Sequence, residues 1–188
     1  HDDLGAGLSA LRLRSEMAQR SEPDPHKRAE FAAMARQAEE LVTNMRQLIW
    51  SMTTEEGDLP GTVEHCLRYA RTYLDEQRLK HALQGDEHIP AIPLSSHQRR
   101  NIFLTLKEAL HNVVKHAAAR TVEVRFAWQD QLELIIADDG VGLPERNAGE
   151  GRGLTNMRKR IEELGGTFTI NGEQGTTIHC AIPIPHRP

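Results

Sequence analysis

KEALHNVVKHA at residues 107–117 and DDGVG at residues 138–142 are the two stretches that decide how this chain folds. In and just before the first stretch, apolar residues recur at helical spacing on one face: Leu106, Leu110, Val113 and Ala117. Glu108, Asn112 and Lys115 fall on the opposite face. A polar stripe on a single amphipathic helix is usually only its solvated side, so its meaning depends on the rest of the chain.

The polar residues of both stretches have side chains that can bind a metal ion, phosphate groups or a nucleotide base. An amide four residues after a carboxylate, with a lysine one turn later, supplies an oxygen ligand for Mg²⁺, a base and a phosphate-binding cation. Asp138 ends the apolar run LELIIAD at residues 132–138, and the glycines after it permit a sharp turn. A carboxylate at that strand end can accept a hydrogen bond from an adenine amino group, although Asp is also an ordinary turn former.

A glycine-rich stretch, GEGRGL at residues 149–154, opens the next predicted helix, which runs from Leu154 to Leu164 and ends at Gly165-Gly166. The backbone N–H groups and dipole of a helix N-terminus can face phosphates. A dinucleotide-binding interpretation fits poorly, because these glycines follow a loop and not a strand of a βαβ unit.

Four segments have the alternating or continuously apolar pattern of strands: residues 122–128, 132–137, 167–170 and 177–182. Gln129-Asp130-Gln131 joins the first pair, and Asn171-Gly172 joins the second pair as a hairpin.

Two helices and an edge strand are predicted before these strands. One helix runs from about Thr62 to His81, and the Pro-interrupted stretch from Ile89 to Leu94 is a candidate edge strand. The helix of the first motif starts after Ser95-Ser96 and runs to about Ala118. The elements together predict an α/β sandwich with helices on one face of a mixed sheet.

The N-terminal residues predict a helical hairpin. Apolar and small residues at steps of three and four form one seam at Leu4, Leu8, Leu11, Ser15 and Ala18, and another at Phe31, Met34, Ala38, Leu41, Met45, Leu48 and Met52. Pro23-Asp24-Pro25 separates the two helices. Two narrow seams favour pairing with a second copy as a four-helix bundle across a homodimer axis. A hairpin docked on its own C-terminal domain is the alternative.

The breaker cluster at residues 57–61, GDLPG, marks a hinge. We therefore expect an α+β protein with two domains, a hairpin at residues 1–56 and a sandwich at residues 57–188.

Composition excludes several classes of function. The 188 residues carry a formal charge of -4 with scattered Lys and Arg, so we expect no nucleic-acid contact. Cys66 and Cys180 match no metal-ligand spacing and are expected to be buried thiols in a reducing, cytoplasmic setting. No apolar run is long enough to cross a bilayer, so no membrane contact is expected within this segment. Because the first residue is His1 and not Met, we expect a fragment of a longer protein.

In their order, these stretches resemble the catalytic core of bacterial two-component sensor histidine kinases, whose ATP domain shares its fold with gyrase, Hsp90 and MutL. KEALHNVVKHA is similar to the family's asparagine box, DDGVGL to its first glycine box and GRGLTNMRKRIEELGG to its second. GTTIHCAIP is similar to the terminal threonine-containing strand. HDDLGAGL, at residues 1–8, resembles the phosphoacceptor box of the subfamily related to the nitrate and membrane-fluidity sensors. The resemblance covers nearly the whole chain. It implies that this chain is the cytoplasmic fragment of a membrane-bound sensor protein.

The resemblance implies catalytic roles for three residues. His1 would be the phosphoacceptor and Asp2 its polarising partner, which leaves one imidazole nitrogen free to attack the γ-phosphate of ATP. Glu108 would assist as a base, and Asn112 would hold Mg²⁺.

It also implies a set of nucleotide-binding residues. Lys115 and His116 are expected at the phosphates, and Asp138 at the adenine amino group. The remaining expected residues form the adenine turn, the lid and the adenine-side strand: Gly140, Gly142, Gly151, Gly153, Leu154, and Thr176 or Thr177. The chain departs from many relatives at Lys107 and His111, where Asn is common, and it lacks the Phe-containing box of larger kinases.

The function implied is that of a protein-histidine kinase. It would phosphorylate His1 from Mg-ATP and pass the group to an aspartate on the receiver domain of a response regulator. Two alternatives stay open. One is an ATP-hydrolysing clamp, in which Glu108 activates water, and the other is a scaffold that binds nucleotide without turnover.

Overall fold

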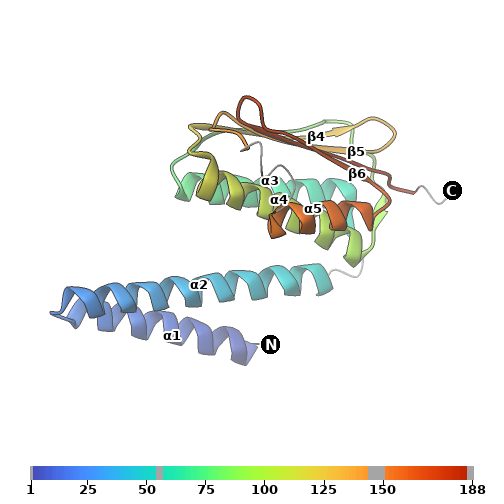
Figure 1. The fold of residues 1–188 in the computed structure, drawn as a ribbon. Coiled ribbons are helices and arrows are strands. Elements are labelled where there is room, and N and C mark those ends of the chain that lie inside the picture. The colour runs from blue at the N-terminus through green and yellow to red at the C-terminus, as the bar shows by residue number, and fades with distance from the viewer. Residues whose placement is uncertain (1, 54–56, 144–150, 186–188) are drawn as a thin grey trace. The chain divides into compact units, whose positions relative to one another are not determined.

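The computed structural model describes residues 2–53, 57–143 and 151–185 (Figure 1). The chain forms two compact units, His1–Thr54 and Glu55–Pro188. His1 and the domain boundary predicted at Glu56 both lie outside the described residues, so the boundary stays a prediction. Within the described ranges, no helix has both the length and the apolar content that spanning a membrane requires.

The first unit is the predicted helical hairpin. α1 (Asp2–Ser21) and α2 (Pro25–Thr53) pack along each other, and the turn between them contains Pro23. The Asp24 carboxylate accepts a hydrogen bond from the backbone N–H of His26 (2.8 Å), which satisfies one of the free donors at the start of α2. Small side chains are buried along the middle of the hairpin: Ser15, Ala35, Ala38 and Val42.

The second unit contains a five-stranded sheet in the order β2-β4-β5-β7-β6. Its strands are β2 (Lys80–Gly85), β4 (Thr121–Trp128), β5 (Leu132–Asp138), β6 (Thr167–Asn171) and β7 (Thr176–Ile182). β2 pairs with β4 in parallel, and the other pairs are antiparallel. The predicted mixed sheet is therefore confirmed. A separate two-stranded sheet joins β1 (Gly57–Asp58) to β3 (Pro93–Leu94).

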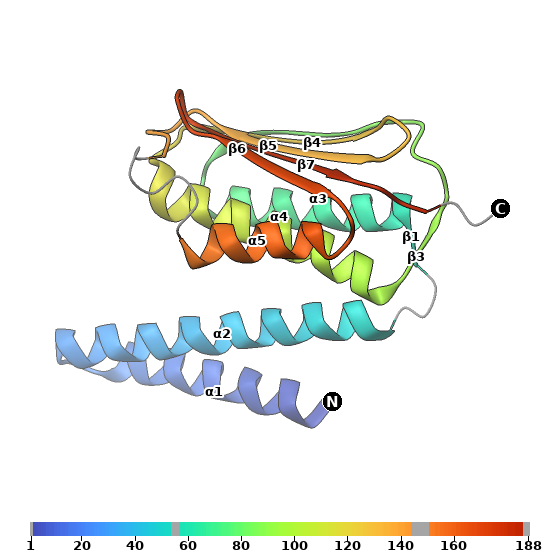
Figure 2. The same ribbon diagram turned by 45° about the vertical axis from the view of Figure 1, so that its right-hand side comes forward.

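Helices cover one face of the five-stranded sheet (Figures 1 and 2). They are α3 (Leu59–Glu76), α4 (Ser96–Asn112) with its π-helical continuation η1 (Val113–Ala117), and α5 (Arg152–Glu162). Alternate residues of the central strands, such as Phe126, Leu134 and Ile136, are buried. Leu106 and Leu110 of α4 are fully buried as well, as the apolar face of that helix predicted.

Two predictions about residues 59–94 were wrong. The helix expected to reach His81 ends at Glu76, because Arg78 takes a left-handed conformation (φ 56°). Residues 80–85 then form β2, whose parallel pairing with β4 outweighs the weak local preference of KHALQG. The edge strand expected over Ile89–Leu94 is confined to β3.

The start of α4 agrees with its predicted cap. The Ser95 hydroxyl accepts a hydrogen bond from the Gln98 N–H (3.2 Å), and the Gln98 side chain accepts one from the Ser95 N–H (2.9 Å). Such a capping box contributes about 1 kcal/mol to helix stability. The cap fixes the residue at which α4 begins.

The two cysteines are buried and free, as predicted. Burial raises the pKa of the Cys66 thiol well above its ordinary value and that of Cys180 to about 12. Both are therefore neutral packing groups at physiological pH.

Candidate functional site

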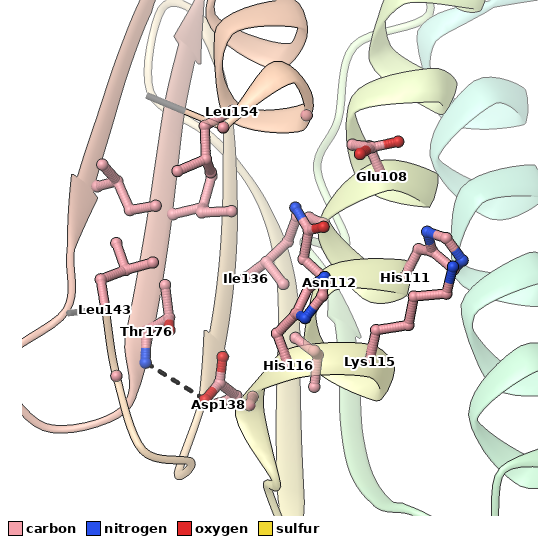
Figure 3. A pocket seen from close by; sticks show the side chains of 18 of the residues that line it. Glu108, His111, Asn112, Lys115, His116, Ile136, Asp138, Leu143, Leu154 and Thr176 are labelled. Atoms are coloured by element: carbon pink, nitrogen blue, oxygen red, sulfur yellow. Dashed lines mark hydrogen bonds between the residues drawn. The ribbon is translucent and has the colours of Figure 1, made fainter. Parts of the chain in front are cut away.

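A cavity of about 1050 Å³ lies between α4 with η1, the start of α5, and strands β5 and β7 (Figure 3). Ten of the predicted site residues line it: Glu108, Asn112, Lys115, His116, Asp138, Gly142, Gly151, Gly153, Leu154 and Thr176. Residues that are far apart in the sequence are thus brought to one place by the fold.

The polar side chains of α4 and η1 form one wall. Glu108 and Asn112 are separated by one α-helical turn, so both face the cavity. After Asn112 the helix widens into the π turn η1, which carries Lys115 and His116 and ends at Ala118 in a left-handed conformation (φ 49°). A π turn shifts the residues after it relative to a regular helix, so Lys115 and His116 both reach the wall.

The two adjacent aspartates have different surroundings. Asp138 lines the cavity, and its Oδ1 accepts hydrogen bonds from the N–H groups of Gly140 (2.9 Å) and Thr176 (3.3 Å). Asp139 is exposed, and its Oδ1 accepts from the N–H groups of Arg120 (2.7 Å) and Thr121 (2.8 Å). The backbone N–H and hydroxyl of Thr121, together with the N–H of Arg120, lower the pKa of Asp139 to about 2. Oδ2 of Asp138 takes part in neither of these hydrogen bonds and can accept one from a ligand in the cavity, whereas Asp139 is not in the cavity wall and ties its turn to the start of β4.

Glycine is needed in the turn after Asp138 for steric reasons. A Cβ on Gly140 would lie 2.1 Å from the carbonyl oxygen of Ala117, and the Val141 N–H donates to that same oxygen (2.8 Å). Gly142 has a φ of 74°, a conformation that other residues rarely adopt. The turn is thus held against the end of η1, which keeps Asp138 and His116 on neighbouring walls (Figure 3).

Strand alternation separates the two threonine candidates. Thr176 pairs with Asp138 in the β5–β7 register and lines the cavity, whereas Thr177 is exposed. Thr177 is therefore not part of the wall. Gly140 is not part of the wall either, and it acts through the shape of the turn.

The first turn of α5 closes one side of the cavity. Gly151 is the N-cap residue and makes no side-chain cap. A Cβ on Gly153 would lie 2.3 Å from Oε1 of Glu108, so the carboxylate of Glu108 sits directly against this turn. The Asn112 amide also lies 3.5 Å from the same position, so both polar side chains of α4 meet the first turn of α5.

Sequence reasoning missed the apolar part of the wall. Ile136, Ile170 and Ile178 line the cavity beside Asp138 and Thr176, and they can pack against a flat ring. Two-residue spacing from Asp138 to Ile136 and from Thr176 to Ile178 is the signal that would have found two of them. His111 also lines the cavity, at a position that had been noted only as a departure from relatives.

Two catalytic predictions cannot be placed in this site. His1 lies outside the described residues, and Asp2 is described only as the first residue of α1. Among the ranges that are described, no group of three or more His, Cys, Asp or Glu side chains could hold a metal ion. An Asn oxygen that shares Mg²⁺ with phosphate and water needs no such group, and the Asn112 amide in the cavity wall fits that chemistry.

Comparison with known families assigns the second unit to a class of ATPases. Residues 97–186 match the family described as histidine kinase-, DNA gyrase B- and HSP90-like ATPase. This range contains α4 apart from its first residue, the residues that line the cavity, and all strands from β4 to β7.

Residues 1–57 match a second family, described as histidine kinase. The two matches occur in the order of the predicted hairpin and ATP-binding unit. The chain belongs to the sensor histidine kinases, in the subfamily of the nitrate-sensor type.

Individual relatives agree with this assignment. The chain is 32% identical over 186 residues to the signal transduction histidine-protein kinase/phosphatase UhpB of Salmonella typhimurium. This alignment covers 97% of the chain and 37% of the relative. The chain is 30% identical to the sensor histidine kinase DesK of Bacillus subtilis, covering 97% and 48%, and 29% identical to the nitrate/nitrite sensor protein NarQ of Escherichia coli, covering 93% and 31%. The chain thus spans between about a third and a half of these relatives.

A solved structure shares the fold. The histidine kinase domain of the blue-light activated histidine kinase of Erythrobacter litoralis EL346 superposes with a TM-score of 0.65 at 19% identity. The match covers 95% of this chain and 94% of that domain.

Proposed function

We propose that this chain is a histidine kinase core that phosphorylates its own His1 from ATP and passes the phosphoryl group to an aspartate of a response regulator. In the first step, a nitrogen of the His1 imidazole bonds to the γ-phosphorus while the bond from that phosphorus to the bridging oxygen of ADP breaks. The observation that carries the proposal is that Asn112, Lys115 and His116 form a common wall and line the same cavity as Asp138.

Different wall residues bind different parts of the nucleotide in this proposal. Asp138 accepts the adenine amino group, and Ile136 and Ile178 pack against the ring. Lys115 neutralises charge on the phosphates and His116 donates a hydrogen bond to them, which lowers the barrier mainly by positioning and electrostatics. Glu108 accepts the proton that the attacking imidazole loses.

Asn112 is the residue that would hold Mg²⁺. Bound Mg²⁺ would neutralise phosphate charge in this site. The chain's own residues would orient the nucleotide and keep its adenine end out of water.

Dimerisation is also proposed, through the hairpin. Small residues are buried within it, whereas larger seam residues are exposed: Leu11 (45%), Met34 (46%) and Leu41 (51%). A second copy of the hairpin would cover these side chains and complete a four-helix bundle. The receiver domain of a response regulator is the proposed second partner, and the cytoplasmic location stays a prediction.

The deciding experiment is labelling with γ-labelled Mg-ATP. We expect label on the protein that is acid-labile and base-stable, is lost in His1→Gln and Asn112→Ala, and is kept in His26→Gln. His26 is a suitable control because it is an exposed histidine of the same hairpin. Asp138→Asn should raise the Kd for ATP by about tenfold or more, since it weakens a hydrogen bond to a charged acceptor.

The absence of label from a folded protein that binds ATP would overturn the proposal. Steady phosphate release would then favour the ATP-hydrolysing clamp, with Glu108 activating water. Binding without phosphate release would favour the scaffold.

A further inference from the structure

The stretch GDLPG at residues 57–61, whose composition predicts a hinge, is attached to the second unit at several points. Its first two residues form β1, which pairs with β3, and the Leu59 N–H donates to the Ile92 carbonyl (2.9 Å). Asp58 is also the N-cap residue of α3, because its Oδ1 accepts a hydrogen bond from the Gly61 N–H (2.9 Å). The Leu59 side chain is completely buried. This stretch is therefore an anchor at the beginning of the second unit, and not a hinge.

A buried guanidinium packs against the β1–β3 pair, which lies beside the start of α4 (Figure 2). Arg99, in the first turn of α4, is only 1% exposed. Its Nη1 donates to the Leu94 carbonyl (2.6 Å), and its Nη2 donates to the Ser96 hydroxyl (3.3 Å). Gly57 is opposite Leu94 in the β1–β3 register, and a Cβ on Gly57 would lie 2.9 Å from Cδ of Arg99. The Arg99 side chain thus packs against both strands.

A charged side chain in this buried place does more than fill space. Burying a guanidinium costs free energy, and an apolar side chain of similar size often packs at least as stably. A guanidinium donates in several fixed directions, so Arg99 can bond to β3 and to its own helix while it lies against β1. Arg99 is therefore suited to fixing one arrangement of β1, β3 and α4.

α4 carries both this anchor and part of the cavity wall. Glu108 follows Arg99 by nine residues, or about 14 Å along the helix axis, and Asn112 follows one turn later. Arg99 is not among the residues that line the cavity. Any effect of Arg99 on the reaction therefore passes through the position of other groups.

We propose that Arg99 is a positioning residue for the phosphorylation of His1. It locks β1 onto α4, so that the segment leading from the hairpin starts at a fixed point relative to Glu108 and Asn112. The identity of the reaction rests on the proposed function. How often a tethered group reaches a site depends on the length and stiffness of the tether. Release of β1 would lengthen the tether and slow phosphorylation without changing the cavity.

Amide hydrogen exchange without nucleotide tests the anchor. The Leu59 amide is the reporter, because its hydrogen bond to the Ile92 carbonyl continues the β1–β3 pairing. Arg99→Met keeps a long side chain without donors, so we expect the Leu59 amide to exchange at least about tenfold faster than in the wild type. The Asp86 amide, which donates to the Phe126 carbonyl, should exchange at its wild-type rate. Unchanged exchange at Leu59 in the folded variant would overturn the proposal.

The initial rate of labelling from γ-labelled Mg-ATP tests the positioning role. Arg99→Met should lower the rate at saturating ATP by at least about tenfold, while the half-saturating ATP concentration changes by less than about twofold. Arg100→Met is the matched control, because Arg100 is the next residue and is exposed, and it should be labelled like the wild type. An unchanged maximal rate in Arg99→Met, or a loss explained by weaker ATP binding, would refute the positioning role.

Gly57→Ala disturbs the same contact without removing the charge, and it also serves if Arg99→Met does not fold. Its methyl would press on the Arg99 side chain, so exchange at Leu59 should rise and the maximal labelling rate should fall. The double variant should show less than the sum of the two effects, since both changes act on one contact. Fully additive effects, or wild-type behaviour of Gly57→Ala, would contradict the proposal.

The two measurements separate this proposal from the kinase proposal. An unlabelled wild type would refute the kinase proposal and the positioning role together. Exchange at Leu59 needs neither nucleotide nor phosphorylation, so it would still decide whether Arg99 holds the anchor.

Discussion

Asp138 and Asp139 are chemically identical neighbours with different partners. Asp138 is the last residue of β5 on the helix-covered face and points into the cavity. Asp139 lies beyond the strand and accepts hydrogen bonds from the backbone that leads into β4. Both carboxylates use Oδ1 to hold the backbone around the turn, and Asp138 keeps its Oδ2 for a ligand in the cavity.

The lowered pKa of Asp139 predicts a pH-dependent contribution to stability. Its folded pKa is about 2 and its ordinary value is 3.8, so the carboxylate stabilises the fold above about pH 4. That stabilisation is lost as the pH falls toward about 2, because protonation removes the charged acceptor. Asp139→Asn should therefore be less stable than the wild type near neutral pH, and the gap should close in acid.

Urea unfolding of both proteins near neutral pH and near pH 3 measures this gap. Other carboxylates titrate in both proteins and cancel in the comparison. An equal difference in unfolding midpoint at the two pH values would show that Asp139 does not make this contribution.

The sequence was sufficient to predict the place of Asp138 but not the role of Asp139. A carboxylate at the end of an apolar run is visible in LELIIAD. The partners of Asp139 are the backbone N–H groups of Arg120 and Thr121. These groups come close to the Asp139 side chain only after β4 pairs with β5. Backbone donors have no sequence signature, so this contact could not be predicted.

At the scale of elements, the site depends on how α4 and α5 meet. Glu108 stands where a side chain at residue 153 would otherwise fit. The packing therefore needs glycine at this position, although glycine lowers helix stability by about 1 kcal/mol relative to alanine.

Gly153→Ala should lower autophosphorylation without unfolding the protein. The added methyl would lie 2.3 Å from Oε1 of Glu108, and a carboxylate at the end of a flexible side chain can move aside. Displacing a catalytic group by about 1 Å can cost about 100-fold in rate, so we expect a loss of at least about tenfold. The measurement is the initial rate of labelling together with the Tm.

Gly151→Ala is the steric comparison, because a methyl group there meets nothing within 4 Å. Its loss of rate should be clearly smaller. Equal losses in the two variants, or a large fall in the Tm of Gly153→Ala, would contradict the proposed contact between Glu108 and α5.

Elements were predicted well where the local pattern was strong. The helices at both motifs and the strands from β4 to β7 lie within a few residues of their predicted bounds. β2 was missed because it is a short edge strand whose partner, β4, comes about forty residues later. The π turn η1 was missed because VVKHA has no local feature that distinguishes it from regular helix.

At the scale of the whole molecule, the hairpin predicts how two copies of the chain associate. Its exposed seam residues predict that the dimer forms through Leu11, Met34 and Leu41. Leu13 is somewhat more exposed (54%) but lies two residues from Leu11, off the seam.

Leu41→Glu should dissociate the dimer, and Leu13→Glu should not. Burying a leucine contributes about 1.5–3 kcal/mol, and a dimer contains two copies, so the dimer Kd should rise by about 100-fold or more. Sedimentation equilibrium across a range of concentrations measures this. A monomeric wild type, or equal dissociation by both variants, would refute the proposed dimer surface.

The position of β7 in the sheet bears on how the protein is made. β7 is the last strand of its unit in the chain, yet it lies between β5 and β6. Thr176 and Ile178 therefore join Asp138 and Ile136 only after translation has passed residue 178, a few seconds after β5 is synthesised. Until then β5 has an unpaired edge and the cavity lacks a wall. A nascent chain that has not yet passed Ile178 thus lacks part of this cavity wall, and a message cut short before β7 yields a product without Thr176 and Ile178.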